Sequence, residues 1–254
     1  MKSLKFWKAA RFDVASYRWK LTERKDRRFL GSGSDTSNTN IYTYNEFGFR
    51  GDSYLQSGFK IMNVGGAHTE GIGVSDTETY PHYLSKLFPR NSGNVDLNFG
   101  YSGRSNDYIA RTILTFTDVV NPDLVCIMYV NPSNREYYTK DGLIEPYAPN
   151  PWGYYNEDPT GIKEFEAFKI TSNPEDDFIN WYKNHLLISN FLAEREIPFV
   201  WDGTFLNNDY TDENKFDGDY KCYQSDDDFA TPSENKAYAN KLYKHLEKVG
   251  IIKK

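Results

Sequence analysis

Four short apolar runs alternate along the chain with four longer segments of helical periodicity, and this alternation constrains the fold more than any other feature. The apolar runs are residues 60–64, 95–99, 124–130 and 197–201, and the helical segments are residues 77–88, 105–119, 176–195 and 233–248. Alternating strands and helices build a parallel sheet with helices on both faces. The sequence therefore predicts an α/β protein with a parallel sheet between two helical layers, whose site lies at the carboxyl ends of the strands.

The chain of 254 residues is long enough for one substantial core and short for two. Residues 31–40 are polar, rich in Gly and Ser, and typical of a linker or an exposed loop. We therefore divide the chain into an N-terminal extension (1–44) and one α/β domain (45–254). Residues 132–175 are rich in proline and show no periodic element, which indicates a long insertion that forms a lid or a substrate wall.

Charge is distributed unevenly between the extension and the domain. Residues 1–28 hold ten Lys or Arg and three acidic residues, a net +7, which leaves −13 for the remainder of a chain of net charge −6. Such a basic arm suits an anionic partner, either nucleic acid or another anionic surface, or else it docks on the acidic body of the same chain. Nothing in the arm resembles a nucleic-acid recognition motif.

Compartment and cofactors are constrained by what the sequence lacks. The two cysteines, Cys126 and Cys222, form neither a disulfide framework nor a metal-ligand pattern, so the chain fits a reducing compartment. No apolar run approaches the roughly 20 residues of a membrane helix, and the basic N-terminus lacks the apolar core of a signal peptide. We predict a cytoplasmic protein without cofactor or membrane partner, with a virion location as the alternative if a phage encodes it.

The first predicted strand ends in a glycine-rich turn, residues 65–71 (GGAHTEG), that leads toward a helix. A nucleophile in such a turn is exposed, and neighbouring backbone N–H groups can stabilise an oxyanion. The turn resembles block I of the SGNH (GDSL-type) hydrolases, in which a serine stands at the place of Ala67. Residues 45–51 and 73–81 resemble the flanks of that block, as found in many bacterial and phage members. The resemblance extends over about residues 45–248. It implies ester hydrolysis and the SGNH hydrolase fold, a three-layer α/β/α architecture with a flavodoxin-like parallel sheet.

Two further segments resemble the blocks that supply the oxyanion hole. Residues 98–106 resemble block II, which gives Gly103 the place of the oxyanion glycine, although a plain turn glycine is the competing interpretation. Asn131 follows the third strand, at the place of the block III asparagine, and Asn134 is its rival. The resemblance adds three more residues to the oxyanion and substrate-binding set: Gly66, His68 and Asn106.

The segment 226–237 resembles block V, which normally carries the catalytic aspartate and histidine. Asp228 takes the aspartate position and Thr231 takes the histidine position, just before Pro232 and the last helix, for which Ser233 is the expected N-cap. Ala67 has no nucleophilic atom, and a threonine hydroxyl is no base near neutral pH. The resemblance thus implies a site without its two reactive groups.

Two functions stay open at this point. The first is an ester hydrolase lineage, acting on a small-molecule or carbohydrate O-acyl ester and inactive as the sequence stands. The second is a non-catalytic binding or virion-associated module on the same fold. Loss of both groups favours a natural pseudoenzyme over a single engineered Ser→Ala change.

Rival catalytic groups have weaker support. Ser53 belongs to a literal Gly-Asp-Ser, but no apolar strand precedes it and no helix follows it. Histidines within helical patterns are expected to pack or to lie at the surface, and these are His82, His185 and His245. A metal-dependent alternative would use Asp209, Asp212, Asp217 and Asp219, whose spacing departs from a calcium loop.

Overall fold

The computed structural model describes residues 28–30, 39–45, 47–89, 93–138, 144–147, 173–203 and 230–252. Several features named above lie outside these ranges: the basic arm up to residue 27, most of the 132–175 insertion, Cys222, Asp228, and the aspartates at 209, 212, 217 and 219.

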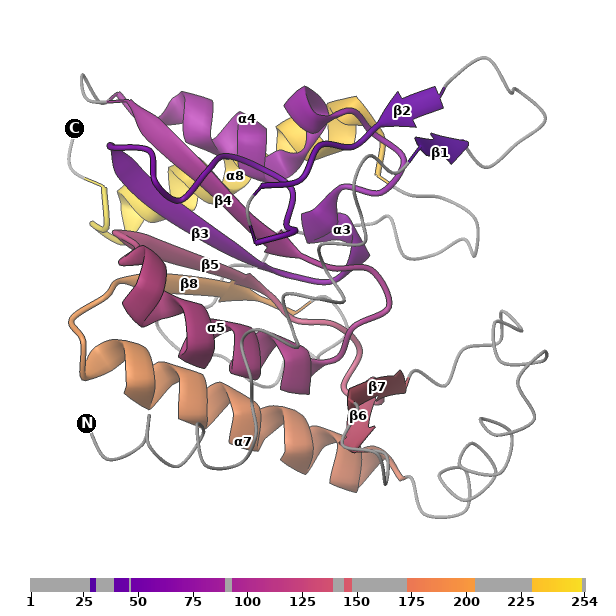
Figure 1. Ribbon diagram of the computed structural model, residues 1–254. Helices are drawn as coiled ribbons and strands as arrows, with labels where there is room; N and C mark the ends of the chain where they lie inside the picture. Colours follow the sequence, from indigo (N-terminus) through magenta and orange to yellow (C-terminus); the bar gives the residue numbers. More distant parts are fainter. Residues whose placement is uncertain are drawn as a thin grey trace.

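Four parallel strands form the central sheet (Figure 1). They are β3 (Phe59–Gly65), β4 (Asn94–Gly100), β5 (Leu124–Met128) and β8 (Phe199–Asp202), in the spatial order β4-β3-β5-β8. Counted along the chain this is 2-1-3-4, which matches the first four strands of a flavodoxin-like sheet. The predicted parallel sheet is confirmed.

Two pairs of helices cover the two faces of this sheet (Figure 1). On one face, α4 (Tyr80–Leu87) and α8 (Pro232–Lys248) pack against the strands. On the other face lie α5 (Asn106–Val120) and α7 (Pro174–Ala193). The architecture is therefore a three-layer α/β/α fold, as predicted. None of the helices in the described ranges is long and apolar enough to cross a bilayer.

Two small antiparallel hairpins complete the described structure. The extension contributes β1 (Arg28–Leu30) and β2 (Thr39–Ile41), which pair with each other. The insertion contributes β6 (Arg135–Tyr138) and β7 (Ile144–Tyr147). The prediction that the insertion lacks regular structure is therefore wrong at this hairpin. Proline at position 146 concealed the second strand, because proline within a strand usually argues against one unless the strand lies at an edge.

Helix starts differ from the predicted ones in two places. The segment 77–88 divides into a 3-10 turn (Asp76–Glu78) and α4, because Thr79 caps α4 by accepting a hydrogen bond from the His82 N–H. The last helix begins at Pro232, and its N-cap is Thr231 instead of Ser233. Proline fits the first helical position, where no N–H partner is required, so the cap falls on the residue before it.

Side chains of β3 alternate between the two helical layers, as the period of a strand requires. Met62 and Val64 enter the core beneath α5 and α7, and Ile61 enters the core beneath α4 and α8. His185 lies in the core beneath α5 and α7. Its Nδ1 is 3.1 Å from the Tyr129 hydroxyl, and its ring stacks on Trp181. The packing role expected of His185 is confirmed, and Cys126 is buried in β5 as expected.

One carboxyl group is buried among these apolar side chains. Asp96 on β4 is 3% exposed, and its Oδ1 lies 3.4 Å from the Asn63 Nδ2 on the neighbouring strand. Burial, and after it the nearby Asp52 carboxylate, raises the pKa of Asp96 to about 8. Asp96 therefore carries its proton at neutral pH, which removes the cost of burying a charge.

Replacing Asp96 with Asn should reduce the pH dependence of stability. Between about pH 4 and about pH 8, Asp96 is ionised in the unfolded chain and protonated in the folded one, so stability falls as pH rises through this window. Asn cannot ionise, so Asp96→Asn should unfold at a higher urea concentration than the parent at about pH 8. Its free energy of unfolding should exceed that of the parent by on the order of a few kcal/mol. Urea unfolding at several pH values measures this. Glu175→Gln, at an exposed position, is the control, and parallel profiles for Asp96→Asn and the parent would contradict the prediction.

Candidate functional site

The nucleophile position lies where β3 turns into the short helix α3 (Ala67–Glu70) at the carboxyl end of the sheet. Gly66 is the N-cap of α3, and half-buried Ala67 is its first residue. A Cβ on Gly66 would stand 2.6 Å from the Val130 Cγ1, and one on Gly65 would stand 2.8 Å from the Met128 carbonyl oxygen. The glycine pair is therefore required by the close approach of the chain that leaves β5.

A buried arginine holds the far end of this turn. Arg50 is 1% exposed, and its NH1 donates to the carbonyl oxygens of Glu70 and Gly71 at the end of α3. Its NH2 donates to the Val74 carbonyl at 2.8 Å, and its Nε donates to the Asp76 Oδ1 at 2.7 Å. The lead-in segment 45–51 therefore binds the loop that follows α3. The sequence predicted this segment to be a flank of block I but indicated no role for Arg50.

The oxyanion position of block II lies in an exposed turn after β4. Gly103 has a φ of 75°, the left-handed region that favours glycine, and a Cβ there would meet nothing within 4 Å. Two hydrogen bonds join this turn to the segment 65–71. The Tyr101 N–H donates to the Gly65 carbonyl at 3.0 Å, and the Ser102 N–H donates to the Glu70 Oε2 at 2.6 Å.

Asn131 and Asn106 have different roles at the end of β5. The Oδ1 of exposed Asn131 accepts hydrogen bonds from the N–H and the hydroxyl of Ser133, so the amide nitrogen is the group that could donate to a ligand. Asn106 is 0% exposed, and its amide donates to the Val130 carbonyl and accepts from the Val130 N–H, both at 3.0 Å. The Asn106 side chain therefore holds the loop that carries Asn131, and a ligand contact of Asn106 stays a prediction.

Thr231, at the histidine position, is committed to capping α8. Its hydroxyl donates to the Glu234 Oε2 at 2.7 Å and accepts from the Glu234 N–H at 3.3 Å, and its own N–H donates to the same carboxylate. This reciprocal arrangement is a capping box. Asn235 then anchors α8 to α4 by accepting a hydrogen bond from the Tyr80 N–H at 3.1 Å.

His68 lies next to Ala67, and its imidazole interacts electrostatically with Glu234 in the first turn of α8. Burial lowers its pKa to about 4, and the Glu234 carboxylate opposes that shift. The imidazole is therefore neutral at pH 7. The His68 ring therefore lies within electrostatic range of the Glu234 carboxylate in the capping box of α8.

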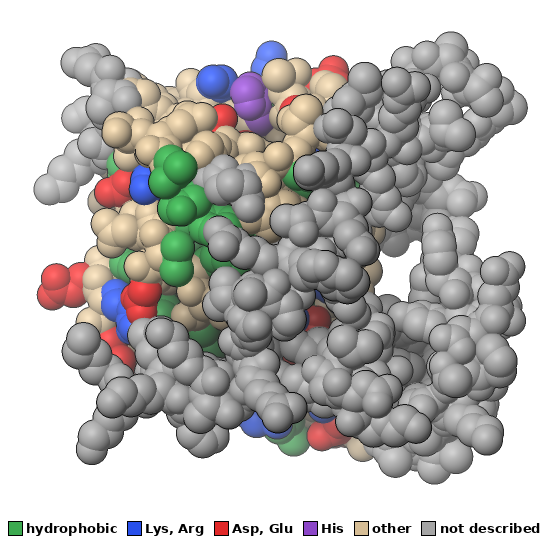
Figure 2. Space-filling view, in the orientation of Figure 1, with side chains coloured by type: hydrophobic (Ala, Val, Ile, Leu, Met, Phe, Trp, Pro, Cys, Tyr) green, Lys and Arg blue, Asp and Glu red, His purple; other side chains and the backbone are tan. Residues whose placement is uncertain are grey.

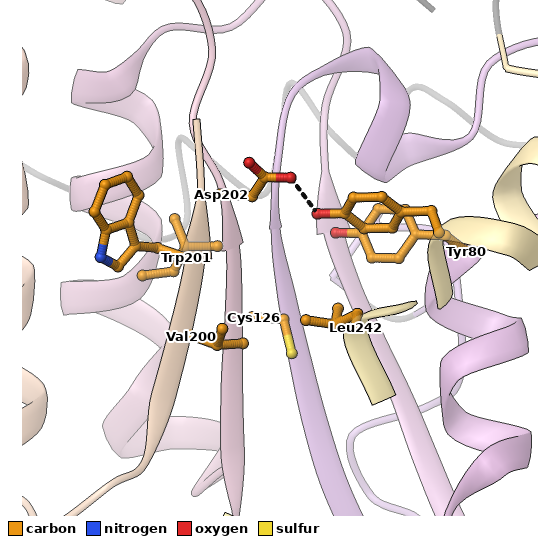
Figure 3. Close-up of a pocket in the computed structure, with 8 residues that line it drawn as sticks. Tyr80, Cys126, Val200, Trp201, Asp202 and Leu242 are labelled. Carbon is orange, nitrogen blue, oxygen red and sulfur yellow. Dashed lines mark hydrogen bonds between the residues drawn. The ribbon is translucent and has the colours of Figure 1, made fainter. Parts of the chain in front are cut away.

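A narrow crevice between β5, β8 and α8 lies below this edge (Figure 3). The Tyr238 hydroxyl donates to the Asp202 Oδ2 at 3.1 Å across it, and the ring of Tyr80 packs on that of Tyr238. The lining side chains fill this crevice and leave no room for a water molecule, so it is a packed seam. The sequence did not single out Asp202. Its position at the carboxyl end of β8 is the sequence feature that could have indicated it.

The rival groups receive little support from their positions. Ser53 lies in the turn before β3, where its Oγ accepts from the Leu55 N–H at 3.2 Å, and it therefore precedes a strand instead of following one. Within the described ranges, no three His, Cys, Asp or Glu side chains lie where they could share a metal ion. The four aspartates of the metal alternative lie outside those ranges, as does Asp228.

The comparisons with known proteins found similar chains among solved structures. No family model and no curated protein matches the chain. Among solved structures, the chain is similar to a catalytic mutant of Axe2, an acetylxylan esterase from Geobacillus stearothermophilus, with 14% identity, 79% of this chain and 99% of that chain covered, and a TM-score of 0.37. It is also similar to AlinE4, an SGNH-hydrolase family esterase, with 15% identity, 79% and 85% covered, and a TM-score of 0.36. A family 3 carbohydrate esterase from Clostridium thermocellum gives 16% identity, 75% and 96% covered, and a TM-score of 0.33. At these scores the sheet and its helical layers, and not the likenesses, establish the fold class.

Replacing Thr231 should test its capping role. Thr231→Val removes the hydroxyl and should lower the free energy of unfolding by about 1 kcal/mol, whereas Thr231→Asn supplies another capping acceptor and should change it by only a few tenths. Denaturant unfolding measures both. Equal losses in the two variants would show that the capping box contributes nothing to stability.

The protonation of His68 can be followed by NMR. Its imidazole should titrate with a midpoint of about 4, and Glu234→Gln should lower that midpoint further because the carboxylate favours the charged ring. Since the folded-state pKa lies below the unfolded one, the stability contributed by neutral His68 is lost as pH falls from about 6.5 to about 4. Glu247→Gln, further along α8, should leave the midpoint unchanged. A midpoint near the ordinary histidine value would contradict the buried, neutral state.

Proposed function

We propose that the chain is an SGNH-type ester hydrolase by lineage whose site keeps its carbonyl-binding groups and has lost its reactive ones. The observation that carries this is the position of Ala67, which opens a helix directly after a strand at the carboxyl end of a parallel sheet. That is the strand–turn–helix context of a nucleophile, and the side chain there is a methyl group.

The remaining groups suit a carbonyl oxygen that gains negative charge. The N–H of Ala67, the N–H of Gly103 and the amide nitrogen of Asn131 are the three donors of the proposal. The first two come from turns that Tyr101 and Glu70 tie together. A carbohydrate O-acyl ester, or a smaller ester, is the ligand class that follows from the family resemblance.

Hydrolysis would require an oxygen nucleophile at position 67 and a base at position 231. A serine at 67 would attack the ester carbonyl, and a histidine at 231 would take the serine proton and pass it to the leaving alcohol. Asp228 would orient that histidine. The present chain has a methyl group at one position and a capping hydroxyl at the other, so neither step has its group.

A second candidate is a binding or virion-associated module that uses the same site without turnover. The specific observation in its favour is the capping box, which gives Thr231 a structural role in place of a chemical one. An anionic partner for this module would meet the basic arm. On the face shown in Figure 2, the acidic and basic side chains of the described residues are interspersed, so they form no single basic area of their own there.

Restoring both groups tests the first proposal. Ala67→Ser with Thr231→His should hydrolyse a short p-nitrophenyl ester about 100-fold or more faster than the parent chain. Its rate should rise with pH through about 6.5, as the new histidine loses its proton. Ala67→Ser with Thr231→Asn keeps a helix cap but has no base, and is the matched control.

Each outcome decides between the candidates. Turnover confined to the Ser/His variant supports the lost-enzyme proposal. Equal turnover in the parent chain would overturn the assignment of positions 67 and 231, and would return attention to Ser53 or to a metal site. Inert but folded proteins, with ligand binding that survives in the parent, would favour the binding module.

A further inference from the structure

Glu70 is a buried acidic side chain that the proposed chemistry does not use. It is the last residue of α3 and is 1% exposed. Glutamate is almost never fully buried unless its oxygens are bound. Here the Oε2 accepts the backbone N–H of Ser102 at 2.6 Å, a contact between residues 32 positions apart in the chain.

The tip of the turn that receives this contact is exposed, between the buried residues Tyr101 and Ser105. Gly103, which follows Ser102, is exposed and has a left-handed φ of 75°. A Cβ on Gly103 would meet no atom within 4 Å. The orientation of the Gly103 N–H therefore depends on the hydrogen bonds at the base of the turn, and Glu70 supplies one of them.

The backbone of Glu70 is held as firmly as its side chain. Its N–H donates to the Gly66 carbonyl at 3.0 Å, and its carbonyl accepts from the Arg50 NH1 at 2.9 Å. A Cβ on Gly100 would stand 2.1 Å from the Glu70 nitrogen, so β4 passes directly against α3 at this residue. Glu70 thus joins the turn that carries Ala67 to the turn that carries Gly103.

We propose that Glu70 is a positioning residue that sets the spacing between the Ala67 N–H and the Gly103 N–H. The length of the Glu70 side chain decides this spacing, because its carboxyl group must reach the Ser102 N–H from α3, whose end Arg50 holds in place. The identity of the two N–H groups as oxyanion donors rests on the proposed function. Such donors act only when both lie about 3 Å from the developing oxyanion, so a small displacement of one turn is enough to weaken them.

A matched set of variants separates reach from charge. Glu70→Gln retains an acceptor oxygen at the same reach, Glu70→Asp retains the carboxyl group but shortens the reach by one methylene group, and Glu70→Ala removes both. The first measurement is amide hydrogen exchange in the otherwise unaltered chain. Exchange at Ser102, whose N–H binds Glu70, should rise about 10-fold or more in Glu70→Asp and Glu70→Ala, and should stay near the parent rate in Glu70→Gln.

Amides of the central strand, at Val125 and Cys126, serve as the control for general destabilisation. If Glu70→Ala does not fold, the comparison of Glu70→Asp with Glu70→Gln carries the same information. Unchanged exchange at Ser102 in Glu70→Asp would overturn the positioning role, whatever the activity of the protein.

The second measurement adds these variants to the Ala67→Ser, Thr231→His protein. Glu70→Asp should lower kcat about 10-fold or more while KM for the ester changes by less than about 2-fold, and Glu70→Gln should retain most of kcat. A purely structural role would instead lower the amount of folded protein and leave the kcat of the folded fraction intact. Faster exchange with unchanged kcat would overturn the link to the oxyanion site and leave the esterase lineage standing. If the restored protein is inert, the proposed function fails, and the exchange data still decide whether Glu70 positions the turn.

Discussion

The buried guanidinium of Arg50 is the interaction on which the site depends. A charged group that is 1% exposed must have its donors bound, and here three backbone carbonyls and one carboxylate accept from it. Two of those carbonyls end α3, where the helix terminus leaves carbonyls unsatisfied. The Tyr42 ring lies 3.8 Å from the guanidinium carbon and closes the remaining side. Arg50 shares the task of holding α3 in place with the Glu70 carboxyl group, which accepts from the Ser102 N–H, and with the Thr69 hydroxyl, which lies 3.2 Å from the Tyr80 hydroxyl.

The contacts around α3 involve none of the reactive groups that the proposed function requires at positions 67 and 231. Glu70 and Asn106 use buried side chains to hold the two turns that carry Gly103 and Asn131. Thr231 uses its hydroxyl to start α8. These contacts stabilise backbone positions and do not depend on a nucleophile or a base. Under the proposed function, this backbone arrangement would therefore persist after both reactive groups had been replaced.

Hydrophobic periodicity was sufficient to predict the order and type of the main elements, because the core faces of β3, α4 and α8 are set by local spacing. Periodicity was insufficient at Thr231 and at Asn106. The cap of α8 depended on the geometry that Pro232 imposes, and polar residues near a helix start offer several caps within one or two positions. Asn106 had the chemistry of a ligand contact, and only the proximity of Val130 showed that its amide is already bound.

The sequence by itself determined the alternation of strands and helices, and it determined that no serine stands at 67 and no histidine at 231, because both are matters of covalent identity. Tertiary structure alone decided the partners of Arg50 and Glu70, the proton on Asp96 and the neutrality of His68. The physical reason is that burial and hydrogen bonding are supplied by residues far away in the chain. Ser102 approaches Glu70, and Glu234 approaches His68, only when the sheet has brought its carboxyl edge together.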